Sequence, residues 1–171
     1  MTQLVARALR DNLKAVTEGD VSAPKIDPAA LNLPYFKATR ATAQNINATS
    51  PVKLTCNTEV YDPQNLYDNA TNYRFTPNKP GLYLVGVYVT CSQIPSACTS
   101  MNARVFKNGS QIDSMATVKV DSTSPHGVLC TTLVQMNGAS DYLESWVAFL
   151  PGSNTDIDIQ GEFWAHCVGK L

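Results

Sequence analysis

The chain has 171 residues, of which 44% are hydrophobic and 16% charged, and its formal net charge is -1. This length suits one domain, or one domain with an appendage. The near-neutral charge argues against a general nucleic-acid binder, which needs a basic surface for phosphates. No segment approaches the roughly 20 apolar residues that span a bilayer. We therefore expect neither nucleic acid nor membrane among its partners.

The N-terminus predicts an amphipathic helix from Thr2 to Val16. Its apolar residues follow the three-and-four spacing of a helix stripe: Leu4, Val5, Ala8, Leu9, Leu13 and Val16. A helix this short is marginal alone, so its stripe must pack on its own domain, on copies of itself or on another protein. Charged residues interrupt the stripe, so it does not resemble a secretory signal peptide, and we expect synthesis in a reducing cytoplasm.

An extended linker follows the helix. Prolines at positions 24, 28 and 34 fix φ and disfavour helix in the residues before them. The residues 1–34 are therefore predicted to form a helix and an attachment arm, and residues 35–171 a separate domain.

After Pro34 the pattern changes to short apolar runs separated by turn residues. The predicted strands are Tyr35 to Ala43, Val52 to Val60, Asn72 to Phe75, Gly81 to Thr90, Met101 to Lys107, Gln111 to Val120, Val128 to Met136, Tyr142 to Leu150 and Thr155 to Val168. The dipeptide Asn108-Gly109, between two alternating runs, is a strong hairpin signal. Many short strands without helical segments between them predict an all-β antiparallel sandwich or jelly roll.

The segment from Cys56 to Val89 resembles the C1q/tumour-necrosis-factor family of jelly rolls. That family places an apolar residue, an Asn or Asp, an aromatic residue, a Phe and then Gly-x-Tyr before a long strand. Here the corresponding residues are Cys56, Asp62, Tyr67, Phe75 and Gly81-Leu82-Tyr83. Two departures exist: the first position is usually Phe, and the interval from Tyr67 to Phe75 is one residue longer than in the family pattern. The resemblance covers about Pro34 to Leu171.

The resemblance implies a ten-stranded jelly roll that assembles as a homotrimer around an apolar axis and has no catalytic activity. Candidate residues of the core or the trimer contact are Tyr83, Val85, Val87, Phe75 and Phe163. The pattern of the strand Gly81 to Thr90 points the same way, because both of its faces are apolar. Such a strand needs a core on one side and a neighbour or partner on the other.

The sequence predicts no catalytic site, metal or cofactor. We expect His126 to be a solvated loop residue, and His166 and Cys167 to point to opposite faces of one strand. Asp156 and Asp158 share a strand face, which suits a carboxylate pair but is better explained by alternation with buried Ile157 and Ile159.

The five cysteines are best interpreted as small buried hydrophobic residues, with a Cys91–Cys98 disulfide as the less favoured alternative. A cluster of tyrosines and asparagines between positions 61 and 73 is either a sugar- or receptor-binding surface or a set of packing positions. Its members are Tyr61, Tyr67, Tyr73, Asn65, Asn69 and Asn72.

The helix and the stretch from Val21 to Ile26 look similar to segments that precede globular heads in bacteriophage structural proteins. The sequence therefore suggests a trimeric virion protein, either a capsid decoration or cement protein or a head-fibre knob. Its arm would attach it to a capsid or tail protein. The candidate attachment residues are Leu4, Val5, Leu9, Leu13 and Ile26. The alternatives are a receptor-binding tail-fibre tip that recognises a host glycan or protein, and a carbohydrate-active enzyme.

Overall fold

The computed structural model describes residues 32–47, 50–92, 94–123, 125–151 and 156–169. The predicted helix from Thr2 to Val16 and nearly all of the arm lie outside these residues. The five candidate attachment residues, Leu4, Val5, Leu9, Leu13 and Ile26, lie outside them as well, so their role stays a prediction.

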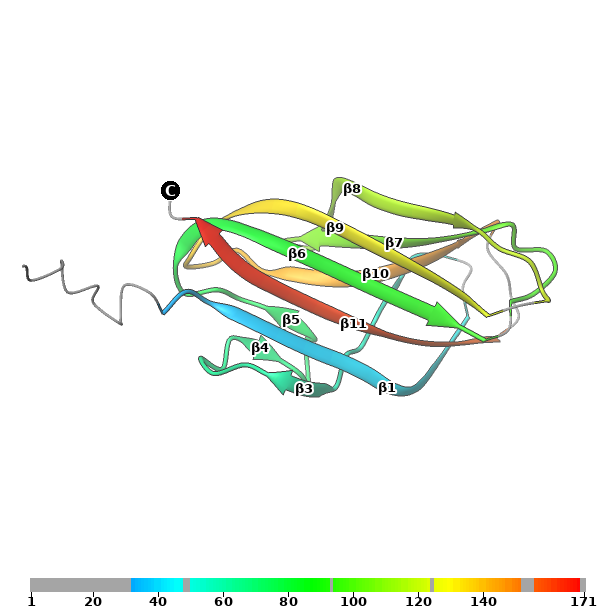
Figure 1. Ribbon diagram of the computed structural model, residues 1–171, viewed down its shortest axis with the longest axis horizontal. Coiled ribbons are helices and arrows are strands. Elements are labelled where there is room, and N and C mark those ends of the chain that lie inside the picture. Colours follow the sequence, from blue (N-terminus) through cyan, green and yellow to red (C-terminus); the bar gives the residue numbers. More distant parts are fainter. Residues whose placement is uncertain (1–31, 48–49, 93, 124, 152–155, 170–171) are drawn as a thin grey trace, which may run out of the picture. The chain divides into compact units, whose positions relative to one another are not determined.

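Eleven strands in the described part of the chain form two antiparallel sheets that face each other (Figure 1). One sheet has the order β3 (Thr58–Tyr61), β1 (Tyr35–Asn47), β11 (Asp156–Gly169), β6 (Pro80–Cys91) and β9 (His126–Asn137). The other has the order β4 (Tyr67–Asp68), β5 (Arg74–Phe75), β10 (Leu143–Leu150), β7 (Ser100–Lys107) and β8 (Ser110–Lys119), and β2 (Val52–Lys53) also pairs with β10. The predicted antiparallel jelly-roll sandwich is thus confirmed, with one strand more than the resemblance implied.

The space between the sheets is filled by an aromatic cluster around Phe36 of β1. The Phe36 ring stacks on Tyr67 and on Phe75, with centroid distances of 4.6 and 4.5 Å, and meets the edge of Phe163 at 4.9 Å. Phe36 and Phe163 belong to one sheet and the other two rings to the second sheet, so the cluster joins the sheets. Each of these rings is buried, as expected for the side chains with the largest apolar area.

The five predicted core or trimer candidates all lie in this interior. Their side chains, Tyr83, Val85, Val87, Phe75 and Phe163, have no exposed surface in the single chain. The Tyr83 hydroxyl donates a 2.8 Å hydrogen bond to the backbone oxygen of Lys79, which satisfies its polar end. These positions are therefore occupied by the core of one copy, and a contact with a second copy must use other residues.

The predicted strand from Val52 to Val60 is wrong, because the chain changes sheets within it. Its first part, β2, pairs with β10, whereas its last part, β3, pairs with β1 in the opposite sheet. Leu54 and Cys56 lie between the two pieces and are fully buried. The Leu54 N–H donates to the Ser145 oxygen at 2.9 Å, so the crossing keeps its backbone hydrogen bond.

The predicted strand from Asn72 to Phe75 begins only at Arg74, because Asp68 holds the preceding residues in a turn. The Asp68 carboxylate accepts hydrogen bonds from the backbone N–H groups of Ala70, Thr71 and Asn72 at 2.8 to 3.1 Å. Such side-chain bonds to the backbone compete with strand pairing. The two-residue strand β4 was not predicted, and β1 extends to Asn47 through an irregular register between Arg40 and Gln44.

All five cysteines are buried and free, so the alternative of a Cys91–Cys98 disulfide is not what the structure shows. Burial raises the pKa of the Cys56 thiol to about 12 and that of Cys91 to about 11. These side chains act as small hydrophobic residues of the core.

Asp141 ties together the two hairpin turns that carry Asn108-Gly109 and Asn137-Gly138. Its carboxylate accepts hydrogen bonds from the Asn108 amide at 2.8 Å and from the Asn137 N–H at 2.9 Å, and pairs with Lys107 at 2.8 Å. Burial alone would raise the pKa of Asp141, but these donors outweigh it and the pKa is lowered. The two glycines and Asn108 adopt positive φ, which the tight turns require.

We predict that Tyr83→Ala lowers the free energy of unfolding by about 3–5 kcal/mol, the range for large aromatic truncations in a core. Urea unfolding monitored by circular dichroism measures the loss. Tyr61→Ala is the control, because its side chain lies on the edge strand β3 and is 47% exposed. Equal losses in the two variants would contradict the position of Tyr83 in the core.

Candidate functional site: the outer face of the five-stranded sheet

The outer face of the sheet that contains β6 and β9 carries large apolar side chains that the single chain leaves open to solvent. Leu129 and Leu133 of β9 are 54% and 55% exposed, and Tyr88 of β6 is 38% exposed. The strand register places Leu129 beside Tyr88 and Leu133 beside Leu84. We call this surface the apolar face and define it by Tyr35, Leu82, Leu84, Tyr88, Leu129, Leu133, Trp164 and Val168.

Two glycines let aromatic rings lie flat against this face. The Trp164 indole of β11 covers Gly86, where any added Cβ would collide with the ring. A Cβ at Gly127 would lie 2.9 Å from the Tyr88 hydroxyl oxygen, so that ring also rests on a bare backbone. Because the two rings lie along the sheet, the apolar face is flat, a shape that suits contact with another folded surface.

Polar side chains border the apolar face on the β1 side, and one of them, His166, lies within it, between Tyr35 and Leu84 in the strand register. Lys37 and Glu162 form an ion pair at 2.9 Å, and the exposed His166 ring lies 5.7 Å from that of Tyr35. A polar rim around an apolar centre is the usual arrangement of an interface between proteins.

The outer face of the other sheet differs, because its aromatic rings are already covered within the chain. Trp146 stacks on Phe106 at a centroid distance of 4.5 Å, and its other neighbour is the Lys53 ammonium group, which pairs with Glu144. The apolar face is thus the large apolar surface that lacks such internal cover among the described residues.

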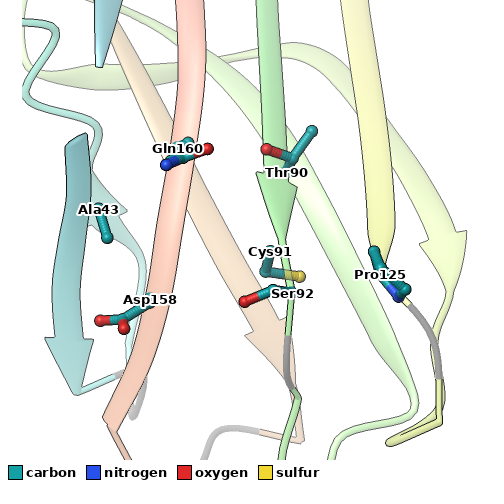
Figure 2. A pocket seen from close by; sticks show the side chains of 7 residues that line it. All are labelled: Ala43, Thr90, Cys91, Ser92, Pro125, Asp158 and Gln160. Carbon is teal, nitrogen blue, oxygen red and sulfur yellow. The ribbon is translucent and has the colours of Figure 1, made fainter. Parts of the chain in front are cut away.

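A pocket of about 310 Å³ lies at the end of the same five-stranded sheet where β6 ends and β9 begins (Figure 2). It is lined by Ala43, Thr90, Cys91, Ser92, Pro125, Asp158 and Gln160. The raised pKa of about 11 keeps the Cys91 thiol protonated near neutral pH, so it is a poor nucleophile. Asp158 accepts a 2.9 Å hydrogen bond from Asn45, which gives this carboxylate a structural partner.

The structure separates the other residues with possible chemistry. His126 is not a solvated loop residue as expected: it begins β9, is half-buried, and its Nε2 accepts a 3.1 Å hydrogen bond from the Asp121 N–H. His166 is exposed and Cys167 buried, so they point to opposite faces as predicted. Ile157 and Ile159 are buried while Asp158 is exposed, as alternation requires.

Within the described ranges, no group of three or more His, Cys, Asp or Glu side chains could hold a metal ion. In the same ranges, no helix has both the length and the apolar character needed to cross a membrane.

The comparisons with known proteins identify the fold. No protein-family model matches the chain, and no curated protein matches it. Among solved structures, the globular domain of zebrafish complement 1qA protein matches with a TM-score of 0.60 and 13% identity, over 81% of this chain and 99% of that one. Eiger TNF from S. frugiperda matches with a TM-score of 0.54 and 11% identity, over 81% and 93%. The PRD1 vertex protein P5 matches with a TM-score of 0.55 and 15% identity, over 80% and 97%.

These similarities define the class: the domain is a C1q/TNF-like jelly roll, and the resemblance of the Cys56 to Val89 segment to that class is confirmed. At identities of 11% to 15% the likeness concerns the fold.

Sequence reasoning identified the two apolar faces of β6, which lies between β11 and β9, but did not single out the outward-facing apolar residues of those two strands. The pattern of β9 carried a usable signal, because Leu129 and Leu133 fall on the face opposite to buried Val128 and Cys130. Trp164 gave no such signal, since its position over Gly86 depends on the pairing of two strands distant in sequence.

We predict that Gly86→Ala displaces the Trp164 indole from the sheet, because the new Cβ would occupy the space of the ring. Tryptophan emission should shift to the red, and stability should fall by about 1–3 kcal/mol, as for other overpacked sites. The emission is measured in a Trp146→Phe background, so that only Trp164 contributes. Gly169→Ala is the matched control, since nothing lies within 4 Å of its added Cβ; an unshifted Gly86→Ala spectrum would contradict the contact.

Proposed function

We propose that the protein is a non-enzymatic homotrimer in which each copy uses its apolar face to bind the next copy. The observation that carries the proposal is the exposure of Leu129 and Leu133 on one face of β9, where they lie beside Tyr88 and Leu84 of β6. Soluble proteins seldom leave such contiguous apolar surface open to water unless it binds a partner. The C1q/TNF-like fold, with the threefold assembly that the family resemblance implies, supports a second copy as that partner.

A closed ring of three copies needs two different surfaces on each copy, because the same patch meeting itself gives a twofold pair. The apolar face supplies one surface. Met115 of β8, which is 48% exposed, lies on the neighbouring edge of the sandwich and is suited to contribute to the other. This arrangement leaves the core residues Tyr83 and Phe163 inside each copy, where the single chain already buries them.

The proposed place of this trimer is a virion, as a capsid decoration or cement protein or as the knob of a head fibre. The predicted arm of residues 1–34 and its resemblance to phage structural proteins support this role. The shared fold of PRD1 vertex protein P5 supports it further. Three arms on one trimer would bind a capsid lattice together, and such linked contacts raise affinity by about a hundredfold or more.

The absence of an activated nucleophile in the described pocket supports a structural role over a catalytic one. The Cys91 thiol is protonated near neutral pH, and Asp158 is engaged by Asn45. Neither group is arranged beside a base, as nucleophilic catalysis requires.

We predict that the double variant Leu129→Asp, Leu133→Asp is monomeric while the wild-type protein is a trimer. Two carboxylates per copy would have to be buried without partners in the contact, at a cost that a marginal interface does not survive. Sedimentation analysis measures the mass, and circular dichroism shows that the variant stays folded. The control Asn78→Asp adds a charge at an exposed loop position outside β6, β8 and β9 and should leave the trimer intact. A wild-type monomer would overturn the proposal.

We predict that deletion of residues 1–31 leaves a folded trimer that no longer attaches to its particle. The deletion stops before Pro34, because that residue is buried and its oxygen accepts a 2.9 Å hydrogen bond from the Cys167 N–H. Immunogold labelling of particles from the source culture locates the full-length protein. Gold over heads supports decoration or a head fibre, and gold confined to tail ends favours the receptor-binding alternative. Unlabelled particles, or attachment that survives the deletion, would overturn the virion role or the role of the arm.

A further inference from the structure

A polar cleft of about 390 Å³ lies at the edge of the sandwich formed by β3, β4 and β5. This edge is opposite to β9 in the order of the five-stranded sheet (Figure 1). Its polar lining includes Glu59, Asn65, Asp68, Asn69 and Arg74. Its volume falls within the range of small-molecule sites, about 300–1,000 Å³.

The walls of the cleft are fixed before any ligand binds. Besides the three backbone bonds already described, Asp68 accepts a 2.6 Å hydrogen bond from the Asn72 amide, and the pKa of Asp68 is lowered to about 2, chiefly by the Thr71 N–H. The lining residues Asn65 and Tyr67 are also held: the Asp62 carboxylate accepts the Tyr67 N–H at 2.7 Å, and the Asp62 backbone oxygen accepts the Asn65 N–H at 3.1 Å. Fixed walls reduce the entropy lost on binding.

Several hydrogen-bonding groups in the cleft are not used by the fold. The side chains of Glu59, Asn65 and Asn69 form no hydrogen bond within the described part of the chain. The Arg74 guanidinium lies 4.7 Å from the centroid of the Tyr142 ring, which orients it, and it forms no ion pair with any described carboxylate. The cleft therefore offers acceptors from Glu59 and two amides, and donors from Arg74 and the same amides.

We propose that this cleft binds a neutral hexopyranose sugar, free or at the end of a glycan. Neighbouring sugar hydroxyls each donate and accept hydrogen bonds, which matches a cleft that carries both kinds of group. The carboxylates of Glu59 and Asp68 outnumber the single Arg74, so a strongly anionic ligand is disfavoured. Leu66 is the one aliphatic side chain of the lining, so the cleft offers little apolar surface to the side chains of a peptide. This proposal does not depend on the virion role.

Saturation-transfer NMR on the full chain tests the proposal with D-glucose, D-galactose, D-mannose and N-acetyl-D-glucosamine as probes. At least one sugar should receive saturable transfer with a millimolar dissociation constant. Glu59→Gln and Asn69→Ala should each weaken that binding by about tenfold, as expected for losing a hydrogen bond to a charged group or an amide.

Asn78→Ala is the matched control, since Asn78 is exposed and outside the cleft lining. Circular dichroism shows that each variant is folded. Absence of saturable transfer with all four sugars overturns the proposal. Binding that persists in both cleft variants, or that Asn78→Ala weakens equally, overturns it too, because the sugar would then bind elsewhere.

Discussion

The contact between Phe36 and the rings of Tyr67, Phe75 and Phe163 is the interaction on which the rest of the structure depends. It joins β1 and β11 of one sheet to β4 and β5 of the other, where the backbone provides no pairing. The short strands β4 and β5 have two residues each and could not hold their place by hydrogen bonds alone. Burial of their rings against Phe36 fixes them, and with them the turn at Asp68 and the walls of the polar cleft.

The need for large apolar side chains on the inner sheet faces also determines which side chains face outwards. Because strand side chains alternate, β6 supplies Tyr83, Val85 and Val87 to the core, and its remaining side chains must face outwards. In the second sheet the outer aromatic rings are covered by charged neighbours, as Trp146 is by Lys53. In the first sheet, by contrast, Leu129 and Leu133 stay about half exposed, although His166 lies beside Leu84 and Glu162 beside Tyr88 in the strand register. This difference is the reason that we propose self-association through the first sheet and not through the second.

Local patterns in the sequence were sufficient for most of the fold. Alternation and turn residues placed the long strands within a few residues, and the set of residues from Cys56 to Gly81-Leu82-Tyr83 pointed to the class. The failures share a cause: each depends on a partner distant in sequence. The segment from Val52 to Val60 has the pattern of one strand, but its first part pairs with β10 and its last part with β1, in opposite sheets. Tyr67 could equally have lain on a binding surface, and only its stacking on Phe36 makes it a core residue. The sequence did not indicate that Glu59 and Arg74 line one cleft. They lie on strands of different sheets, β3 and β5, and only the packing of the two sheets brings them together.

The two surfaces inferred here use opposite physical principles, and this allows them to coexist in one small domain. Binding at the apolar face is driven by the exclusion of water over a wide, flat area and does not require an exact ligand geometry. Binding in the polar cleft draws little free energy from the burial of apolar surface. It depends on donors and acceptors in fixed positions, and the Asp68 turn helps to hold them there. Weak binding at such a cleft is useful only when several copies act together. A threefold assembly through the apolar face would present three clefts in fixed geometry, so that sugar contacts of millimolar strength add up on a surface with many glycans.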